Sequence, residues 1–228
     1  MGYDNVFSGR YTAWIAAVMC LIVASILFTN LKKGAPAQVS KKEPYLATLK
    51  VAFESARNPR VALAYVAGVV SRGDLSVVST FFSLWLFNEA STQGLSPGAA
   101  FKLSTGFYIT VQAFAIPGAI LINFFIDRVD RVMALAIAMF IAAGGYLYLG
   151  YIEDPINAPT VIGFSIFNTQ LALTQMHLGA AWLGLGEIFA NISAISLIGS
   201  AAPVKGRGAV IGGFSFFGAI GILLVALI

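Results

Sequence analysis

Charged positions divide the chain into long apolar stretches. A membrane-spanning helix needs about 20 mostly apolar residues, at 1.5 Å each, to cross roughly 30 Å of hydrocarbon. Six stretches approach or exceed this length, and none shows the alternation of a transmembrane strand. The pattern therefore predicts an all-α integral membrane protein, a six-span helical bundle. The predicted spans are 11–31, 61–87, 103–126, 132–152, 177–202 and 208–228.

Two segments have other interpretations. The stretch 160–176 is apolar but repeatedly interrupted by polar residues, which favours an interfacial segment or an extramembrane extension of the fifth span. The first 31 residues resemble a signal peptide in length. In a signal peptide, however, the basic residues precede the apolar run, whereas Lys32 and Lys33 follow it here. We therefore expect 11–31 to be a retained span.

Composition excludes several classes of protein. Hydrophobic residues make up 58% of the 228 and charged residues only 11%, against about 25% charged in ordinary globular chains. Disordered, disulfide-stabilised and cytosolic enzyme classes are all disfavoured. One Cys and one His are too few for an ordinary zinc site, so no metal or cofactor is predicted. No nucleophile elbow, phosphate loop or paired His is present, so we expect no enzyme.

Basic residues set the orientation. The net charge is +4, but most of the basic residues lie in the loops between predicted spans and form no patch for nucleic acid. The positive-inside rule places basic loops in the cytoplasm, which predicts an outside N-terminus in a multi-pass protein. Short loops and the absence of a targeting tract favour a bacterial inner membrane. Only Arg10 and Lys102 fall on the opposite side. The cytoplasmic set is Lys32, Lys33, Lys41, Lys42, Lys50, Arg57, Arg60, Arg128, Arg131, Lys205 and Arg207.

Three ionisable residues lie at membrane depth: Arg72 and Asp74 in the second span and Glu187 in the fifth. Asp74 lies about 20 Å from the cytoplasmic end of its helix and Glu187 about 15 Å from the outer end of its own, so the two can meet near the midplane. A charge there costs at least about 2.5–3.5 kcal/mol. Burial also disfavours the ionised carboxylate.

These costs suggest a coupling site. We expect Arg72 to pair with one acid, Glu187 being the suggested partner, and the other acid to bind a proton or cation. The alternative is one satisfied charge pair that locks two helices together without any transport role. Aromatic residues can line a solute cavity or simply face lipid and its interface; they are Tyr65, Phe81, Phe82, Trp85, Tyr108 and Phe114.

The loop Asn123-Phe-Phe-Ile-Asp127-Arg128-Val-Asp130-Arg131 resembles the G-x-x-x-D-R-x-G-R signature of the major facilitator superfamily. Asn123 and Asp130 replace the two glycines, as in the degenerate copy of the family's C-terminal half. The segment from Pro203 to Gly212 looks like the P-x-x-x-R-G-x-x-x-G start of the eleventh helix, with Lys205, Arg207 and Gly208 in that cytoplasmic loop. Gly208 and Gly212 also form a step suited to close helix packing.

The resemblance implies helices six to eleven of a secondary transporter. Residues 1–31 would be the last helix of the N-terminal half, 32–60 the basic central loop, and 61–228 the C-terminal half without its last helix. Asp127, Arg128 and Arg131 would then form the gating loop, Asp127 at the start of a neighbouring helix. The partners implied are the lipid bilayer, a small-molecule solute, a proton or cation, and the missing N-terminal half. A non-transporting scaffold or accessory subunit is the alternative, and a channel a weaker one.

Overall fold

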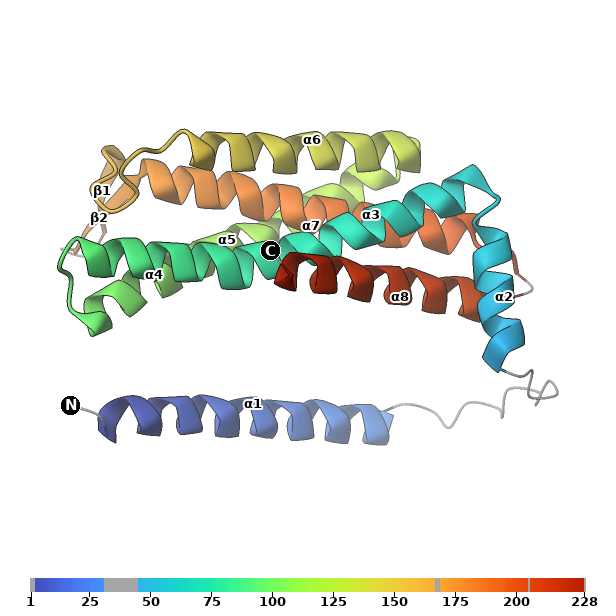
Figure 1. Ribbon diagram of the computed structural model, residues 1–228, viewed down its shortest axis with the longest axis horizontal. Coiled ribbons are helices and arrows are strands. Elements are labelled where there is room, and N and C mark those ends of the chain that lie inside the picture. The colour runs from blue at the N-terminus through green and yellow to red at the C-terminus, as the bar shows by residue number, and fades with distance from the viewer. Residues whose placement is uncertain (1–2, 31–44, 167–168, 205, 228) are drawn as a thin grey trace. The chain divides into compact units, whose positions relative to one another are not determined.

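Helices occupy every apolar stretch that the sequence predicts to span the membrane. The computed structural model describes residues 3–30, 45–166, 169–204 and 206–227, which form two compact units divided between residues 44 and 45. The first unit contains α1 (Tyr3–Asn30), at the first predicted span. The second is the bundle in Figure 1. Its elements are α2 (Tyr45–Ser55), α3 (Pro59–Ser76), the π-helical η1 (Val77–Phe82), α4 (Ser83–Thr92), α5 (Pro97–Ile126), α6 (Arg131–Gly150), β1 (Thr160–Ile166), β2 (Thr169–Thr174), α7 (Gln175–Ala201) and α8 (Arg207–Ala226).

The long helices of the second unit meet the requirements of membrane spans. Among the described residues, five helices are long and apolar enough to cross a bilayer: the continuous α3–η1–α4 helix of 34 residues, α5, α6, α7 and α8. Large apolar side chains point outward, for example Phe140 with 79% and Ile116 with 69% of its surface exposed. Outward apolar side chains suit lipid rather than water. The prediction of an all-α, multi-pass membrane protein is therefore confirmed.

Glycines allow the helices to approach α7, which contacts α3, α5, α6 and α8. A Cβ on Gly184 would overlap the carbonyl oxygen of Val111 in α5, and one on Gly186 would overlap the backbone of Ala142 in α6. Close backbone approach of this kind is how small residues stabilise membrane helices. Both glycines lie within three residues of Glu187. α7 is therefore held between α5 and α6 at the depth of that acid.

In α8 the packing glycines are not the predicted pair. No described atom lies within 4 Å of a Cβ built on Gly208 or Gly212. A Cβ on Gly221 would instead overlap the carbonyl oxygen of Val69 in α3, and one on Gly213 would lie 2.6 Å from the Tyr65 hydroxyl. The expectation that the Gly208–Gly212 step packs helices is therefore wrong within this unit, because that side of α8 faces no described neighbour.

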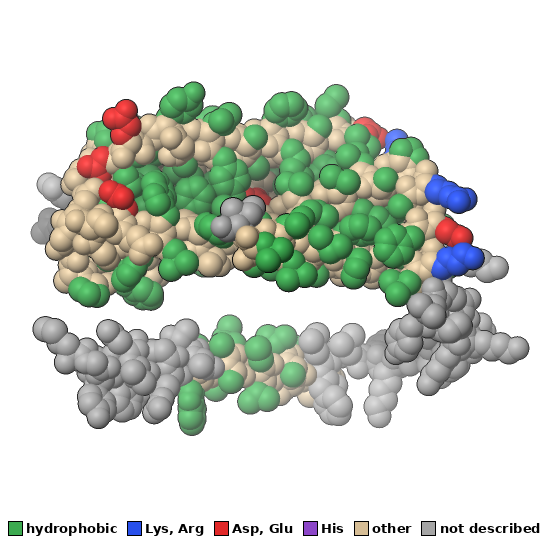
Figure 2. Space-filling model, viewed as in Figure 1, with side chains coloured by type: hydrophobic (Ala, Val, Ile, Leu, Met, Phe, Trp, Pro, Cys, Tyr) green, Lys and Arg blue, Asp and Glu red, His purple; other side chains and the backbone are tan. Residues whose placement is uncertain are grey.

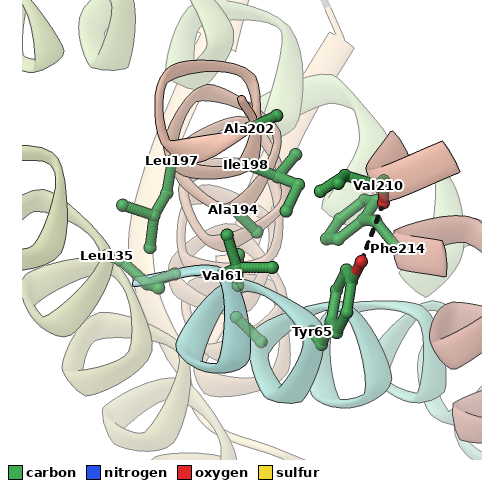
Figure 3. Close-up of a cluster of buried hydrophobic side chains, with 11 residues drawn as sticks. Val61, Tyr65, Leu135, Ala194, Leu197, Ile198, Ala202, Val210 and Phe214 are labelled. Atoms are coloured by element: carbon green, nitrogen blue, oxygen red, sulfur yellow. Dashed lines mark hydrogen bonds between the residues drawn. The ribbon is translucent and has the colours of Figure 1, made fainter. Parts of the chain in front are cut away.

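A buried cluster joins α3, α6, α7 and α8 near the beginning of α3 (Figure 3). The hydroxyl of Tyr65 donates a hydrogen bond to the carbonyl oxygen of Val210, 3.2 Å away, and lies 3.1 Å from that of Ala52 in α2. Phe53 of α2 packs edge-on against Phe217 of α8, with ring centroids 5.8 Å apart. The segment 32–60, predicted as a basic loop, thus contains the helix α2. This helix forms because its apolar residues pack against α3 and α8 of the bundle.

A β-hairpin occupies most of the segment 160–174. β1 and β2 pair antiparallel from Thr160 opposite Thr174 to Ile166 opposite Thr169. Among the described residues, no candidate span includes this segment, as predicted. Of the two alternatives for it, the helical extension of α7 is wrong, and the interfacial segment stays a prediction. β-Branched and aromatic residues of β1 favour a strand over a helix.

Polar side chains of two loops meet near this hairpin. The carboxylate of Asp154 accepts hydrogen bonds from the backbone amides of Ile156 and Asn157 and from the Gln93 side chain. These bonds lower the pKa of Asp154 to about 2, and the bond from the Asn157 amide has the largest effect. The ionised carboxylate therefore ties the α6–β1 loop to the end of α4.

Candidate functional site

Asp74 lies at the end of α3, three residues before the π-helical segment η1. Its carboxylate accepts a hydrogen bond from the hydroxyl of Tyr146, which projects from α6. Both side chains are partly buried. The bond therefore joins α3 to α6. The nearby η1 also indicates a functional site, because π-helical turns are frequent at such sites.

Glu187 lies on α7 inside the bundle, with 6% of its surface exposed. Its Oε2 atom has no hydrogen-bond partner among the described residues. The carboxyl groups of Asp74 and Glu187 are close enough to repel one another when both are ionised. The structure therefore brings together the two acids that the sequence placed at a similar depth.

Arg72 does not join them. Within the described part of the chain it forms no ion pair with either acid. Its stem lies against α8, since a Cβ on Gly218 would be 2.8 Å from the Arg72 Cγ. Residues two apart point about 200° apart around a helix. Arg72 therefore faces α8 while Asp74 faces α6, and the expected pair with Glu187 is not formed in this structure.

Two cavities adjoin Tyr146. One, of about 420 Å³, is lined by side chains of α3, α6, α7 and α8 that include Asp74 and Ser71. The other, of about 400 Å³, is lined by Phe81, Phe82 and Trp85 together with Tyr146. Three of the six aromatic residues considered as cavity lining therefore do line one. Tyr65, in contrast, serves the packing of α2 and α8.

The signature-like loop holds its shape through a residue that departs from the signature. Asp130 caps the N-terminus of α6 by accepting a hydrogen bond from the Val132 amide at 2.9 Å. Its other oxygen pairs with Arg60 at 3.5 Å. Asp127 is the C-cap residue of α5, whereas Asp130 makes the helix-start hydrogen bond within the loop, to α6. The contact of Asp127 with the start of a neighbouring helix stays a prediction.

The basic residues of the predicted gating loop and Arg207 lie in or beside loops at one end of the bundle. Arg128 follows α5, and Arg131 begins α6. Figure 2 shows basic side chains at the end where α3 and α6 begin, and acidic side chains beside the hairpin at the other end. Arg207 and Gly208 begin α8 after Gly206, which has a left-handed φ of 90°. Lys205 lies outside the described residues.

Sequence reasoning missed Tyr146 and the Arg60–Asp130 pair. Tyr146 lies in an apolar run, and the available signal was its hydroxyl, because a buried Tyr usually finds a hydrogen-bond partner. The Arg60–Asp130 pair had no signal, since 70 residues separate its members. Across the described residues, no three His, Cys, Asp or Glu side chains are grouped so that they could hold a metal ion.

A bundle of apolar helices with acids inside and a charged loop at one end defines a polytopic membrane protein. The profile of the Major Facilitator Superfamily matches residues 3–226, and the chain belongs to that family. This assignment supports a transporter type of function at the level of the family; its members are typically not enzymes.

Curated relatives are magnetosome proteins. The chain is 26% identical over 222 residues to the magnetosome protein MamZ of Paramagnetospirillum magneticum, covering 94% of this chain and 32% of that one. It is 27% identical over 169 residues to MamZ of Magnetospirillum gryphiswaldense, with coverages of 74% and 24%. Similarity to MamH of P. magneticum is 25% over 168 residues, with coverages of 72% and 35%. The chain thus spans about a third or less of these relatives. No solved structure matches it.

Proposed function

We propose that the chain is part of a secondary transporter that moves a small solute by alternating access, with Asp74 and Glu187 binding the coupling proton or cation. The observation that carries the proposal is the pair of interacting acids inside the bundle. Within the described part of the chain, neither acid has a Lys, Arg or His nitrogen within 4.0 Å.

The energetics require an ion at this pair. Each charge at membrane depth costs at least about 2.5–3.5 kcal/mol, and neighbouring carboxylates repel each other, so both do not ionise readily. The pair therefore holds a proton or binds a cation. Because Asp74 lines the cavity of about 420 Å³, an ion there can be coupled to a solute in the same cavity.

The wider arrangement follows the family. In this proposal, 1–31 is the last helix of an N-terminal half, 32–60 the central loop and 61–228 most of the C-terminal half. Relatives about three times as long or longer are consistent with a working carrier that includes a further half. Asp127, Arg128 and Arg131, with the loop before α8, would bias one access state through contacts made in that state only.

Location and orientation are also proposals. The basic loops support an outside N-terminus in a bacterial inner membrane. Because the matched relatives are named magnetosome proteins, a magnetosome membrane is the second candidate. Membrane fractionation of a tagged chain distinguishes the two.

The site is tested by infrared titration of the purified chain in lipid nanodiscs. We expect a protonated-carboxyl band that titrates with pH and is altered by Asp74→Asn and by Glu187→Gln. Because coupled acids titrate as a pair, each variant should also change the titration of the remaining acid. Glu54→Gln is the control, since Glu54 is an exposed carboxylate. Repeating the titration in sodium and in choline chloride separates cation binding from proton binding.

The scaffold alternative predicts a different outcome. If neither variant alters a titrating band, the two acids bind no exchangeable ion and the coupling proposal is wrong. Solute binding is tested separately by screening compounds that raise the melting temperature of the chain, as a ligand of the folded state must. Solute transport by the 228-residue chain alone would refute the proposal that a further half is required.

A further inference from the structure

A separate cavity of about 400 Å³ lies at the hairpin end of the bundle, away from Asp74. Side chains of α4, α5, α7 and the loop after α6 line it, and most of them are apolar, such as Leu103, Phe107 and Met176. Its volume is in the range of small-molecule sites. None of the residues that line it is acidic, whereas Lys102 and His177 are both among them.

Local hydrogen bonds fix the tautomer of His177. The backbone amide of Thr174 donates to Nδ1 of His177 at 3.3 Å, and the Thr174 hydroxyl lies 2.9 Å from the same nitrogen. Since Nδ1 accepts, the proton of the neutral ring is on Nε2. Nε2–H has no hydrogen-bond partner among the described residues, so it is the donor that the ring offers to a ligand.

Lys102 adds a positive charge to the same cavity. It lies on α5, one turn before Gly106, which also lines the cavity. An ammonium group and an N–H donor bind an anionic oxygen and bind a neutral or cationic group poorly. The apolar walls favour a hydrophobic body attached to that anion.

We propose that this cavity binds a small amphiphilic anion, a carboxylate or phosphate attached to an apolar body, with Lys102 and His177 holding the anionic group. The site is independent of the pair of acids, Asp74 and Glu187, proposed above to bind the coupling ion. Its anion can come from a soluble molecule or from a lipid headgroup, and the experiment separates these sources.

The probe is 1-naphthoate, whose fluorescence reports binding to the chain in phosphatidylcholine nanodiscs. Its neutral analogue 1-naphthalenemethanol tests the role of charge. Lys102→Met removes the ammonium group and keeps an apolar stem; Lys50→Met, at an exposed position on α2, is its control. Gly106→Leu fills the cavity, because a Cβ there meets no described atom within 4 Å. Gly98→Leu, also unobstructed on α5 but not among the lining residues, is the matched control.

We expect Lys102→Met to weaken naphthoate binding about tenfold, the usual effect of losing one hydrogen bond to a charged group, and to leave the neutral analogue unaffected. Gly106→Leu should abolish binding of both. Competition by added phosphatidylglycerol, absent in Lys102→Met, would assign the anion to a lipid; lack of competition would assign it to a soluble molecule. Equal effects of Lys102→Met on both probes, or unchanged naphthoate binding in Gly106→Leu, would overturn the proposal.

Discussion

Replacing Gly184 by Ala tests whether close packing around Glu187 stabilises the bundle. The added Cβ would overlap the carbonyl oxygen of Val111 in α5. Val111 is fully buried, so its backbone has little room to move away. Overpacking costs about 1–3 kcal/mol, and a backbone obstacle favours the upper value. The higher helix propensity of Ala than of Gly offsets up to about 1 kcal/mol of this cost. The expected net loss is about 2 kcal/mol, a factor of about 30 in the unfolding equilibrium.

The assay is reversible unfolding of the chain in mixed micelles by added dodecyl sulfate, followed by circular dichroism. Gly199→Ala is the matched control, because Gly199 lies on the same helix and its Cβ would meet no described atom within 4 Å. We expect this control to be neutral or slightly stabilising. Equal stability of the two variants would refute the conclusion that α5 and α7 pack through Gly184.

Three further predictions use the same unfolding assay or amide exchange. Asp130→Ala should cost about 1 kcal/mol through loss of the α6 cap, and Asp127→Ala clearly less; equal losses would show that the cap is not decisive. Because the pKa of Asp154 is lowered to about 2, its loop contacts should be complete above the ordinary pKa of an Asp, about 4, and lost as pH falls toward 2. Protection of the Asn157 amide against exchange, measured relative to an unstructured peptide at the same pH, should fall over that window in the wild type but show no such transition in Asp154→Asn. Tyr65→Phe should destabilise the bundle by about 1–2 kcal/mol by removing a buried hydroxyl bond, and unchanged stability would contradict that role.

The spans could be predicted from sequence because length and apolarity alone determine which segments cross a bilayer. Counting residues along each predicted span also placed the acids Asp74 and Glu187 at a similar depth in the membrane. The hydrogen-bond partner of Asp74 could not be predicted. The sequence shows that Arg72 and Asp74 point to different sides of one helix, but which helix occupies each side depends on how the bundle packs. Tyr146, which occupies the side of Asp74, was therefore missed.

Prediction from local sequence also failed where one segment could form either a helix or a strand. The stretch 160–174 has the apolar content of a helix, yet Val161, Ile162 and Phe164 are strong strand formers. Pairing with β2 satisfies the backbone of β1 without any contact to a long helix, so the hairpin forms. Asp130 likewise stands where the signature has a glycine. In the structure it supplies the helix cap and the partner of Arg60.

Asp74 lies beside the point at which the long helix changes its packing partners. The 34-residue helix packs through α3 against α7 and α8, and through α4 against α5. The change of partners takes place at η1, where the regular i to i−4 hydrogen bonding is interrupted, and interruptions of that kind are where helices bend. Asp74 precedes the interruption by one turn and is bonded to α6. In the proposed carrier, gain or loss of a proton there would change a bond at the junction between the two halves of the helix, and an ion-binding step would bias the conformation at that junction.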